Sequence, residues 1–414
     1  MATIAVLGTL DTKGREHAFV AECIRLRGHR ALLIDVGTGG QPQVEADISK
    51  ETVAGAGGID LDALRSRGDR GECIAAMASA APQLLGRLVR NGEINAVIAL
   101  GGGGGTAIAA AAMRALPIGF PKLIVSTMTS GNISPYVGTK DIAMIPSVVD
   151  IAGLNRISKV IFSRAAGAIC GMVESTISVE DEKPLIAASM FGNTTECINS
   201  ATALLEKAGY EVLVFHATGT GGKAMEALIE SGAIDGVLDV TTTELADELV
   251  GGVLTAGPDR VEAAARAGVP AVVAPGCLDM VNFGERESVP KQFEGRKFYI
   301  HNPQVTLMRT SRDECVQLGA VLAAKVNSYR SPVTVLIPRR GVSGISQEGG
   351  PFYDPEADAA LFESLTNGLR PDIQVISLDC SINDAAFARA CSDALLENIS
   401  LAVGRDAFLA KLPF

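Results

Sequence analysis

The chain of 414 residues has no tryptophan, and only 4% of its residues are aromatic although 47% are hydrophobic. Such a composition, rich in alanine, glycine and valine, is typical of α/β proteins. No apolar run approaches the roughly 18 residues of a membrane-spanning helix. The N-terminus, Met1 to Leu7, lacks a basic flank and meets Asp11 too soon for a signal peptide. We therefore expect a cytoplasmic protein that is neither exported nor membrane-spanning.

Positive charge is also scarce. Lysine and arginine number 36 against 47 acidic residues, which gives a net charge of −11 and a pI near 5.0. The summed field repels polyanions, so we expect neither a nucleic acid nor an anionic membrane as the main partner, whereas a local anion pocket remains compatible. The eight cysteines include no C-x-x-C pair, which argues against a zinc ribbon or a disulfide framework and predicts reduced, largely buried thiols. No H-x-x-x-H or E-x-x-H spacing occurs, so we expect no metal bound by side chains alone.

Short strands rich in valine, isoleucine and leucine alternate with longer helical patterns, as parallel sheets with crossover helices require. The first half has predicted strands at 4–10, 31–36, 96–100 and 122–125 and predicted helices at 14–27, 71–90, 106–116 and about 149–173. The second half has predicted strands at 185–189, 212–215, 237–240, 271–274, 298–300, 333–337 and 373–378.

A charge cluster with a proline, Val179 to Pro184, separates the two series and is typical of a solvated hinge. We predict an α/β fold of two Rossmann-like subdomains with mostly parallel sheets that face an interdomain cleft. The first, residues 1–180, is the predicted nucleotide-binding subdomain, and the second covers residues 181–414.

Five consecutive glycines, Gly101 to Gly105, join the predicted strand at 96–100 to Thr106 and an alanine-rich predicted helix. A glycine run can adopt positive φ and bring backbone N–H groups close to a ligand, and the helix that follows directs its partial positive end at the same point. This junction predicts a phosphate or carboxylate site. A tight strand-to-helix turn is the alternative interpretation.

Ligands of such folds collect at the carboxyl ends of the strands. The loop after the first predicted strand, Gly8 to Gly14, is neither a G-x-G-x-x-G nor a Walker A sequence, but it holds two hydroxyls, a lysine and a carboxylate. Lys13 is suited to pair with a phosphate, and Asp11 either holds Mg²⁺ through water or caps the helix. Asp35 ends the second predicted strand, where an acidic residue binds ribose hydroxyls in nucleotide-binding folds; a surface carboxylate is the alternative.

The loops after the second and fourth predicted strands are likewise rich in glycine, serine and threonine, which donate hydrogen bonds without steric bulk. Turn chemistry explains any one of these loops equally well, but four of them in succession favour a nucleotide over a hydrophobic ligand. The predicted nucleotide-binding residues are Gly8, Thr9, Asp11, Thr12, Lys13, Asp35, Gly37, Gly101, Gly102, Gly103, Gly104, Gly105, Thr106, Ser126, Thr127, Ser130 and Gly131.

In the second half, the loop His216 to Lys223 repeats the design of a strand, a glycine-rich loop and a helix, and it therefore predicts a second anion cradle. His216 and His301 both follow or end predicted strands, where a histidine can transfer protons near neutral pH or simply be a hydrogen-bonded loop residue. Glu244 is a candidate base, although its spacing from Thr241 also matches a helix capping box. The candidate catalytic residues are thus His216, Glu244 and His301.

Arg339 and Arg340 follow the predicted strand at 333–337. Two adjacent arginines at a strand end can clamp a carboxylate or a phosphate through paired hydrogen bonds. Solvated arginines are the alternative interpretation.

Several strings, taken together, resemble a largely uncharacterised bacterial family that is similar to the N-terminal ATP-binding domain of the tomato mosaic virus resistance protein. The strings are GTLDTKG at 8–14, GGGGGT at 101–106, HATGTGG at 216–222, TTTELAD at 241–247, HNPQVTLMRT at 301–310 and PFYDP at 351–355. The resemblance spans nearly the whole chain. It implies ATP binding with Mg²⁺, two Rossmann-like subdomains and a homodimer, but it supplies no reaction, and the virus-inhibiting role of the plant domain does not follow from it.

The leading hypothesis is an ATP-binding enzyme, in which the first subdomain holds the nucleotide and the second presents a small carboxylated or phosphorylated metabolite across the cleft. Two facing Rossmann-like lobes with glycine-rich loops also suit a nucleotide-sugar epimerase or transferase. The third hypothesis is a nucleotide-sensing module that binds ATP without turnover.

Overall fold

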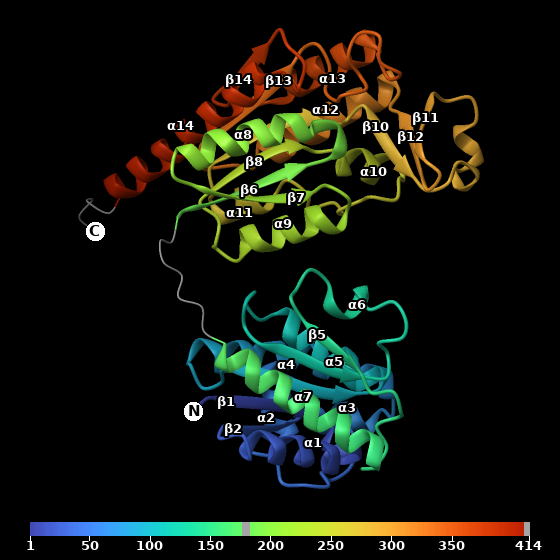
Figure 1. Cartoon of the computed structure of the whole chain (residues 1–414), viewed down its shortest axis with the longest axis vertical. Coiled ribbons are helices and arrows are strands. Elements are labelled where there is room, and N and C mark those ends of the chain that lie inside the picture. The colour runs from blue at the N-terminus through green and yellow to red at the C-terminus, as the bar shows by residue number, and fades with distance from the viewer. Residues whose placement is uncertain (176–182, 410–414) are drawn as a thin grey trace. The chain divides into compact units, whose positions relative to one another are not determined.

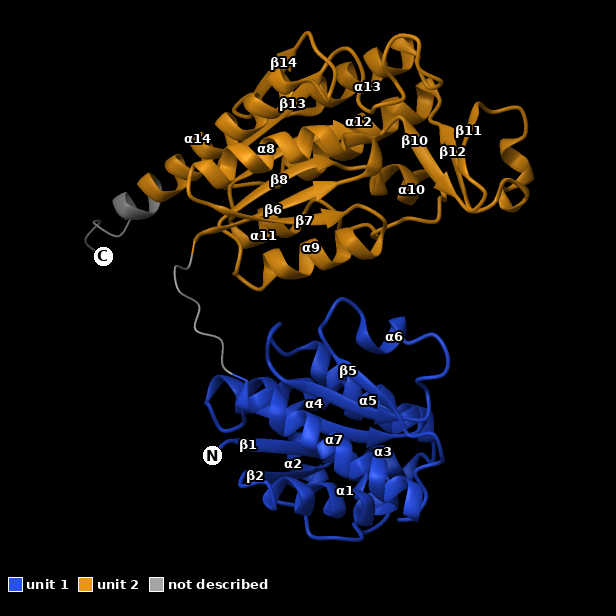
Figure 2. Ribbon diagram, in the orientation of Figure 1, with its two compact units in different colours: residues 1–179 blue, residues 180–414 orange. Residues whose placement is uncertain are grey.

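The computed structural model describes residues 1–175 and 183–409. The chain divides into two compact units, residues 1–179 and 180–414 (Figure 2). Most of the predicted hinge, Val179 to Pro184, lies outside the described residues.

Unit 1 is a five-stranded parallel sheet with the order β2-β1-β3-β4-β5 (Figure 1). Its strands are β1 (Thr3–Gly8), β2 (Arg30–Asp35), β3 (Ala96–Gly101), β4 (Lys122–Ser126) and β5 (Ala143–Pro146). Its helices are α1 (Leu10–Arg25), α2 (Lys50–Ala56), α3 (Leu61–Ser66), α4 (Arg70–Arg90), α5 (Gly103–Arg114), α6 (Ser134–Val137) and α7 (Arg156–Glu174).

Helices cover both faces of this sheet. Helices α1 and α7 pack against one face, and α2, α4 and α5 pack against the other. All six residues of β3 are buried, because a central parallel strand is covered on both sides and therefore consists of a continuous apolar run.

Unit 2 contains a six-stranded parallel sheet with the order β14-β13-β9-β8-β6-β7. Its strands are β6 (Leu185–Met190), β7 (Glu211–His216), β8 (Gly236–Thr241), β9 (Ala271–Gly276), β13 (Val333–Pro338) and β14 (Gln374–Leu378). Its helices are α8 (Thr195–Lys207), α9 (Thr220–Glu230), α10 (Glu244–Val250), α11 (Ala263–Ala267), α12 (Arg312–Val326), α13 (Pro355–Gly368) and α14 (Ala385–Leu409), with short 3₁₀ turns η1 (Gly192–Thr194), η2 (Arg286–Ser288) and η3 (Lys291–Phe293). Read from β7, the order repeats that of unit 1 with one strand added.

A separate antiparallel sheet, with the order β10-β12-β11, interrupts unit 2 between β9 and α12 (Figure 1). It consists of β10 (Met280–Phe283), β11 (Phe298–Asn302) and β12 (Val305–Arg309). The prediction that residues 298–300 form a strand of the parallel series was therefore wrong. Its side chains are mostly exposed, and the short turn to β12 suits an antiparallel pair, because parallel neighbours need a long crossover.

The prediction for the thiols is confirmed, since all eight cysteines are free, seven of them are buried and Cys380 is half-buried. Among the described residues, no helix is long and apolar enough to cross a membrane.

Candidate functional site

The strand order of unit 1 reverses beside β1, which has β2 on one side and β3 on the other. Ligands of open α/β sheets bind beyond the carboxyl ends of the strands at such a point. A cavity of about 740 Å³ lies there, formed by residues of unit 1 alone. Its lining consists of Thr9, Asp11, Thr12, Lys13, Thr38, Gly39, Gly40, Arg65, Gly68, Asp69, Arg70, Cys73, Ile74, Gly102, Gly103, Gly104, Gly105 and Ile108.

The N-terminus of α5 opens into this cavity. Gly102 is the N-cap residue, and no side chain caps the helix. The N–H of Thr106 donates to the carbonyl oxygen of Gly102 at 2.9 Å and so closes the first turn. The N–H groups of the preceding helical residues have no partner within the helix, and the helix dipole adds a partial positive charge to them. This end of α5 therefore suits an anion.

The structural reason for glycine differs among the five positions of the run. None of them has a positive φ, so none is required by a left-handed backbone. A Cβ atom on Gly101 would lie 2.5 Å from the backbone nitrogen of Thr106, and one on Gly104 would lie 2.8 Å from Cδ1 of Ile74. Backbone packing thus accounts for Gly101, whereas at Gly104 the close atom is the end of a flexible side chain that can move aside. A Cβ atom on Gly103 would meet no atom within 4 Å, so its missing side chain instead leaves free space beside the N–H groups of α5.

The loop after β1 contributes Lys13 and Asp11. Lys13 has non-helical dihedral angles that kink α1, and its Nζ donates to the carbonyl oxygen of Ile151 at 2.5 Å, which leaves two of its three N–H groups for a ligand. Asp11 lies in the first turn of α1, where Thr9 is the N-cap, so it does not cap the helix. One carboxylate oxygen of Asp11 accepts the N–H of Gly39 at 2.7 Å, and the other is buried with no hydrogen-bond partner.

Two further cations line the cavity. Nε of Arg65 donates to the carbonyl oxygen of Thr38 at 3.1 Å, whereas its Nη2 is buried with no partner. Arg70 is exposed at the start of α4 and has no ion pair among the described residues. With Lys13 the lining has three cations and the two carboxylates of Asp11 and Asp69, and Nη1 of Arg65 also pairs with Asp62 at 3.3 Å outside the lining.

The sequence interpretation overlooked Arg65 and Arg70. The available signal was the density of arginine around Gly68, since Arg65, Arg67 and Arg70 fall within six residues. These arginines lie on the long connection between β2 and β3 rather than directly after a strand. A search restricted to the residues that follow strands therefore does not find them.

Asp35 has a different role from either interpretation of the sequence. It is 1% exposed, and its Oδ1 accepts the N–H groups of Leu10 at 3.0 Å and Gly37 at 2.8 Å. Burial raises the pKa of this carboxyl group, and the two N–H donors oppose the shift. Asp35 does not line the cavity, so it is neither a ribose ligand nor a surface carboxylate here. It holds the loops after β1 and β2 together.

Gly8 is explained by packing rather than by a ligand. A Cβ atom there would lie 1.8 Å from Nε2 of His17, whose ring is fully buried. Burial lowers the pKa of His17, and its Nδ1 hydrogen-bonds to the carbonyl oxygen of Lys13 at 2.6 Å. Gly8 and His17 therefore brace the turn that presents Lys13.

The hydroxyls of Thr106 and Ser126 bind one another at 2.7 Å, and both residues are fully buried. They join α5 to β4 and do not reach the cavity. Of the predicted nucleotide-binding residues, the structure brings Thr9, Asp11, Thr12, Lys13 and Gly102 to Gly105 to the cavity. The others, Gly8, Asp35, Gly37, Gly101, Thr106, Ser126, Thr127, Ser130 and Gly131, do not line it.

The second glycine-rich loop already holds an anion that belongs to the chain itself. Oε1 of Glu244 accepts the N–H groups of Gly219 at 2.7 Å and Gly222 at 3.1 Å. A Cβ atom on Gly222 would lie 2.1 Å from Oε2 of Glu244. The loop is thus an anion cradle, as its sequence suggested, but its ligand is this carboxylate.

Arg260 fixes Glu244 from the opposite side. The guanidinium of this buried arginine donates to Glu244 at 2.6 Å, to both oxygens of Asp239 at 2.5 and 2.7 Å, and to Glu226 at 3.1 Å. Burial alone lowers the pKa of Arg260, but the three carboxylates outweigh it and hold the pKa well above its usual value. Glu244 is fully buried within this network, so it cannot reach a substrate as a base. It is not part of a capping box either, since α10 has Thr243 as its N-cap residue and no side-chain cap.

The two candidate histidines lie apart in the fold. His216 is exposed at the end of β7, an edge strand of the parallel sheet, with its ring 5.5 Å from that of Phe191. His301 is exposed on β11, an edge strand of the antiparallel sheet, with its ring 6.5 Å from that of Tyr299. No hydrogen bond or ring contact joins these histidines to each other in the described chain. A shared catalytic role stays a prediction.

Comparison with known proteins identifies relatives over nearly the whole length. Models of the N-terminal and C-terminal domains of an uncharacterised protein family, UPF0261, match residues 2–178 and 183–399. A UPF0261 protein of Clostridium tetani is 49% identical over 395 residues, which cover 95% of this chain and 98% of that protein. The ToMV resistance protein Tm-1 of Solanum lycopersicum is 46% identical over 338 residues, which cover 79% of this chain and 45% of that protein.

Among solved structures, UDP-GlcNAc 2-epimerase from Neisseria meningitidis bound to UDP-GlcNAc matches with 11% identity and a TM-score of 0.24, over 66% of this chain and 82% of that one. The spinosyn rhamnosyltransferase SpnG complexed with thymidine diphosphate matches with 10% identity and a TM-score of 0.19, over 98% of this chain and all of that one. Sequence identities and TM-scores this low support no inference about function.

Proposed function

This chain belongs to the UPF0261 family, and we propose that it is an ATP-binding protein that holds ATP with Mg²⁺ in the cavity of unit 1. The observation that carries the proposal is the uncapped N-terminus of α5, which opens into a cavity that is also lined by Lys13, Arg65 and Arg70. Backbone N–H groups at a helix N-terminus and neighbouring cations are the groups that bind phosphates in nucleotide sites.

Each group has a distinct role in this proposal. The N–H groups of α5 beside Gly103 receive phosphate oxygens, and the two arginines and Lys13 neutralise their charge. The free carboxylate oxygen of Asp11 fits Mg²⁺, because this ion is usually bound through one or two carboxylates, waters and the phosphates of the nucleotide. Mg²⁺ would supply charge neutralisation there.

We further propose that the protein acts on a small carboxylated or phosphorylated metabolite. Phosphoryl or adenylyl transfer requires a positioned base in addition to charge neutralisation. One observation favours the alternative of an ATP sensor without turnover. The lining contains no histidine, and each of its carboxylates, Asp11 and Asp69, already accepts a backbone N–H group. ATP consumption on incubation with Mg²⁺ and a metabolite pool supports the enzyme, and tight binding without consumption supports the sensor.

Titration calorimetry of Arg65→Gln tests the nucleotide site. We expect the wild type to bind ATP and the variant to bind it at least about tenfold more weakly, since a hydrogen bond to a charged group contributes roughly 1.5–3 kcal/mol. Arg67→Gln is the matched control, because Arg67 is exposed, pairs with Glu72 at 2.5 Å and does not line the cavity.

Three ligands separate the hypotheses in the same titration: ATP, ADP and a nucleotide sugar. Preference for the nucleotide sugar would favour an epimerase or a transferase. The ATP proposal is wrong if the wild type ignores all three ligands, or if Arg65→Gln binds ATP as tightly as Arg67→Gln does.

A further inference from the structure

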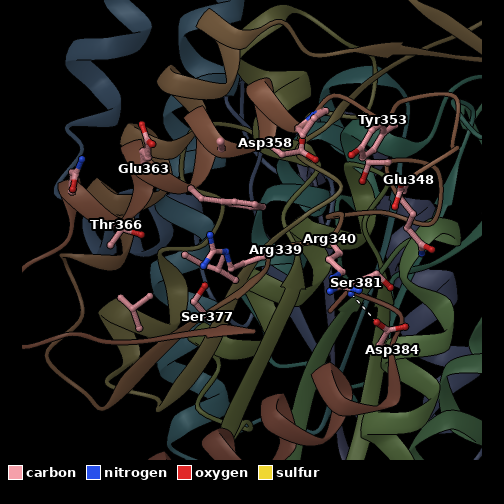
Figure 3. A pocket seen from close by; sticks show the side chains of 18 residues that line it. Arg339, Arg340, Glu348, Tyr353, Asp358, Glu363, Thr366, Ser377, Ser381 and Asp384 are labelled. Atoms are coloured by element: carbon pink, nitrogen blue, oxygen red, sulfur yellow. Dashed lines mark hydrogen bonds between the residues drawn. The ribbon is translucent and has the colours of Figure 1, made fainter. Parts of the chain in front are cut away.

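Unit 2 has a larger cavity, of about 1040 Å³, at the carboxyl ends of β13 and β14 (Figure 3). Helix α13 and the segment that follows β13 complete its wall. This edge of a parallel sheet is where α/β folds bind ligands. Its lining shares no residue with the cavity of unit 1 or with the network around Arg260, and it includes both Arg339 and Arg340.

The two arginines differ in how they are engaged. Arg340 donates through Nε and Nη2 to the two oxygens of Asp379, at 2.8 and 2.6 Å. Arg339 has no ion pair and no side-chain hydrogen bond among the described residues, although its backbone N–H is fixed to the carbonyl oxygen of Leu378 at 2.9 Å. Its side chain lies in the middle of the view in Figure 3, above Ser377. Arg339 therefore presents a guanidinium without an ion pair on an anchored backbone, although it is close enough to Asp379 to help Arg340 lower the pKa of that carboxyl group.

The carboxylates of the lining limit how much negative charge a ligand can carry. Asp358 is paired with the buried Arg309 at 2.5 Å, and Asp384 accepts the N–H of Ser381 at 2.8 Å. Glu348 and Glu363 have no ion pair in the described chain. The lining has four carboxylates and two arginines, of which only Arg339 has no ion pair, so a polyphosphate or a tricarboxylate is repelled more strongly than a single carboxylate.

The remaining wall is partly apolar. Ile337, Phe362 and Val375 contribute hydrophobic side chains from β13, α13 and β14. Most of the other lining residues are polar or charged, so this apolar wall can hold only the body of a small ligand while the polar groups fix its orientation.

We propose that this cavity binds a small monocarboxylate with an apolar body, and that Arg339 binds its carboxylate. The planar guanidinium can donate two parallel hydrogen bonds to the two carboxylate oxygens. The apolar body packs against Phe362 and its neighbours. The proposal does not depend on ATP binding in unit 1.

Ligand-observed NMR of the full chain tests this proposal with phenylacetate, isovalerate, the neutral analogue phenylacetamide, and inorganic pyrophosphate. We expect the two acids to bind. The amide should bind at least about tenfold more weakly because it has no charge for the arginine to pair with, and pyrophosphate should bind at least about tenfold more weakly because its several negative charges are repelled by the carboxylates of the lining. Arg339→Gln is expected to lower affinity for the acids by about tenfold or more. Arg312→Gln is the matched control, since Arg312 is exposed at the start of α12 and does not line the cavity.

The proposal is overturned if the wild type binds neither acid. It is also overturned if Arg339→Gln and Arg312→Gln bind the acids equally well, or if pyrophosphate binds more tightly than the acids do. Circular dichroism of both variants verifies that they are folded, which is expected because both arginines are exposed.

Discussion

Replacing Arg260 by methionine is expected to lower the free energy of unfolding by about 3–5 kcal/mol, the usual cost of removing one partner from a buried ion pair. Arg260 is 1% exposed and compensates Asp239, Glu244 and Glu226. Methionine fills a similar volume but leaves these carboxylates without their cation. Urea unfolding followed by far-UV circular dichroism measures the change, and the absence of tryptophan makes this signal preferable to fluorescence.

Arg266→Met is the matched control for this prediction. Its side chain is 46% exposed and pairs with Glu230 and Glu262 at the surface, where ion pairs contribute only about 0–1 kcal/mol. Equal losses of stability in the two variants would contradict the assignment of Glu244 as a structural anion. Glu244 would then again be a candidate catalytic base.

The second large effect concerns binding rather than stability. Gly103→Val is expected to weaken ATP binding by about a hundredfold or more, because the valine methyl groups fill the space through which phosphate oxygens approach the N–H groups of α5. Stability is expected to change by less than about 1 kcal/mol, since Gly103 is exposed with ordinary φ and glycine is itself a poor helix residue. Calorimetric titration measures the binding, and urea unfolding measures the stability.

Gly171→Val serves as the control for this substitution. Gly171 is exposed within α7, and an added Cβ atom there also meets nothing within 4 Å, but it does not line the cavity. If Gly103→Val bound ATP like the wild type, the end of α5 would not be the phosphate site. Equal weakening by Gly171→Val would mean that the effect is not local to the cavity.

Local sequence signals predicted the central elements well. The apolar run at 96–100 became β3, and the predicted helix at 71–90 became α4 with Asp69 as its N-cap residue. The short strands β5, β10 and β12 went unpredicted. Each has only four or five residues, which is too short for a periodic pattern to mark it.

The candidate site was predictable in position but not in detail. Asp11 and Asp35 both follow or end strands, and only the tertiary structure shows that Asp35 is sealed beneath the loops while Asp11 faces the cavity. The second glycine-rich loop was correctly interpreted as an anion cradle, but its anion is Glu244, which comes from the next strand-to-helix connection. Long-range pairing of this kind leaves no pattern in a single sequence.

Amide hydrogen exchange of the full chain with and without ATP and Mg²⁺ tests the central claim most directly. The first N–H groups of α5 have no partner within the helix and should exchange fast without ligand. We predict that ATP slows exchange at Gly103 to Gly105, with a smaller effect at Arg65 to Arg70, and leaves His216 to Gly222 unchanged because Glu244 already occupies that cradle. Slower exchange at His216 to Gly222 with no change at Gly103 to Gly105 would contradict the account.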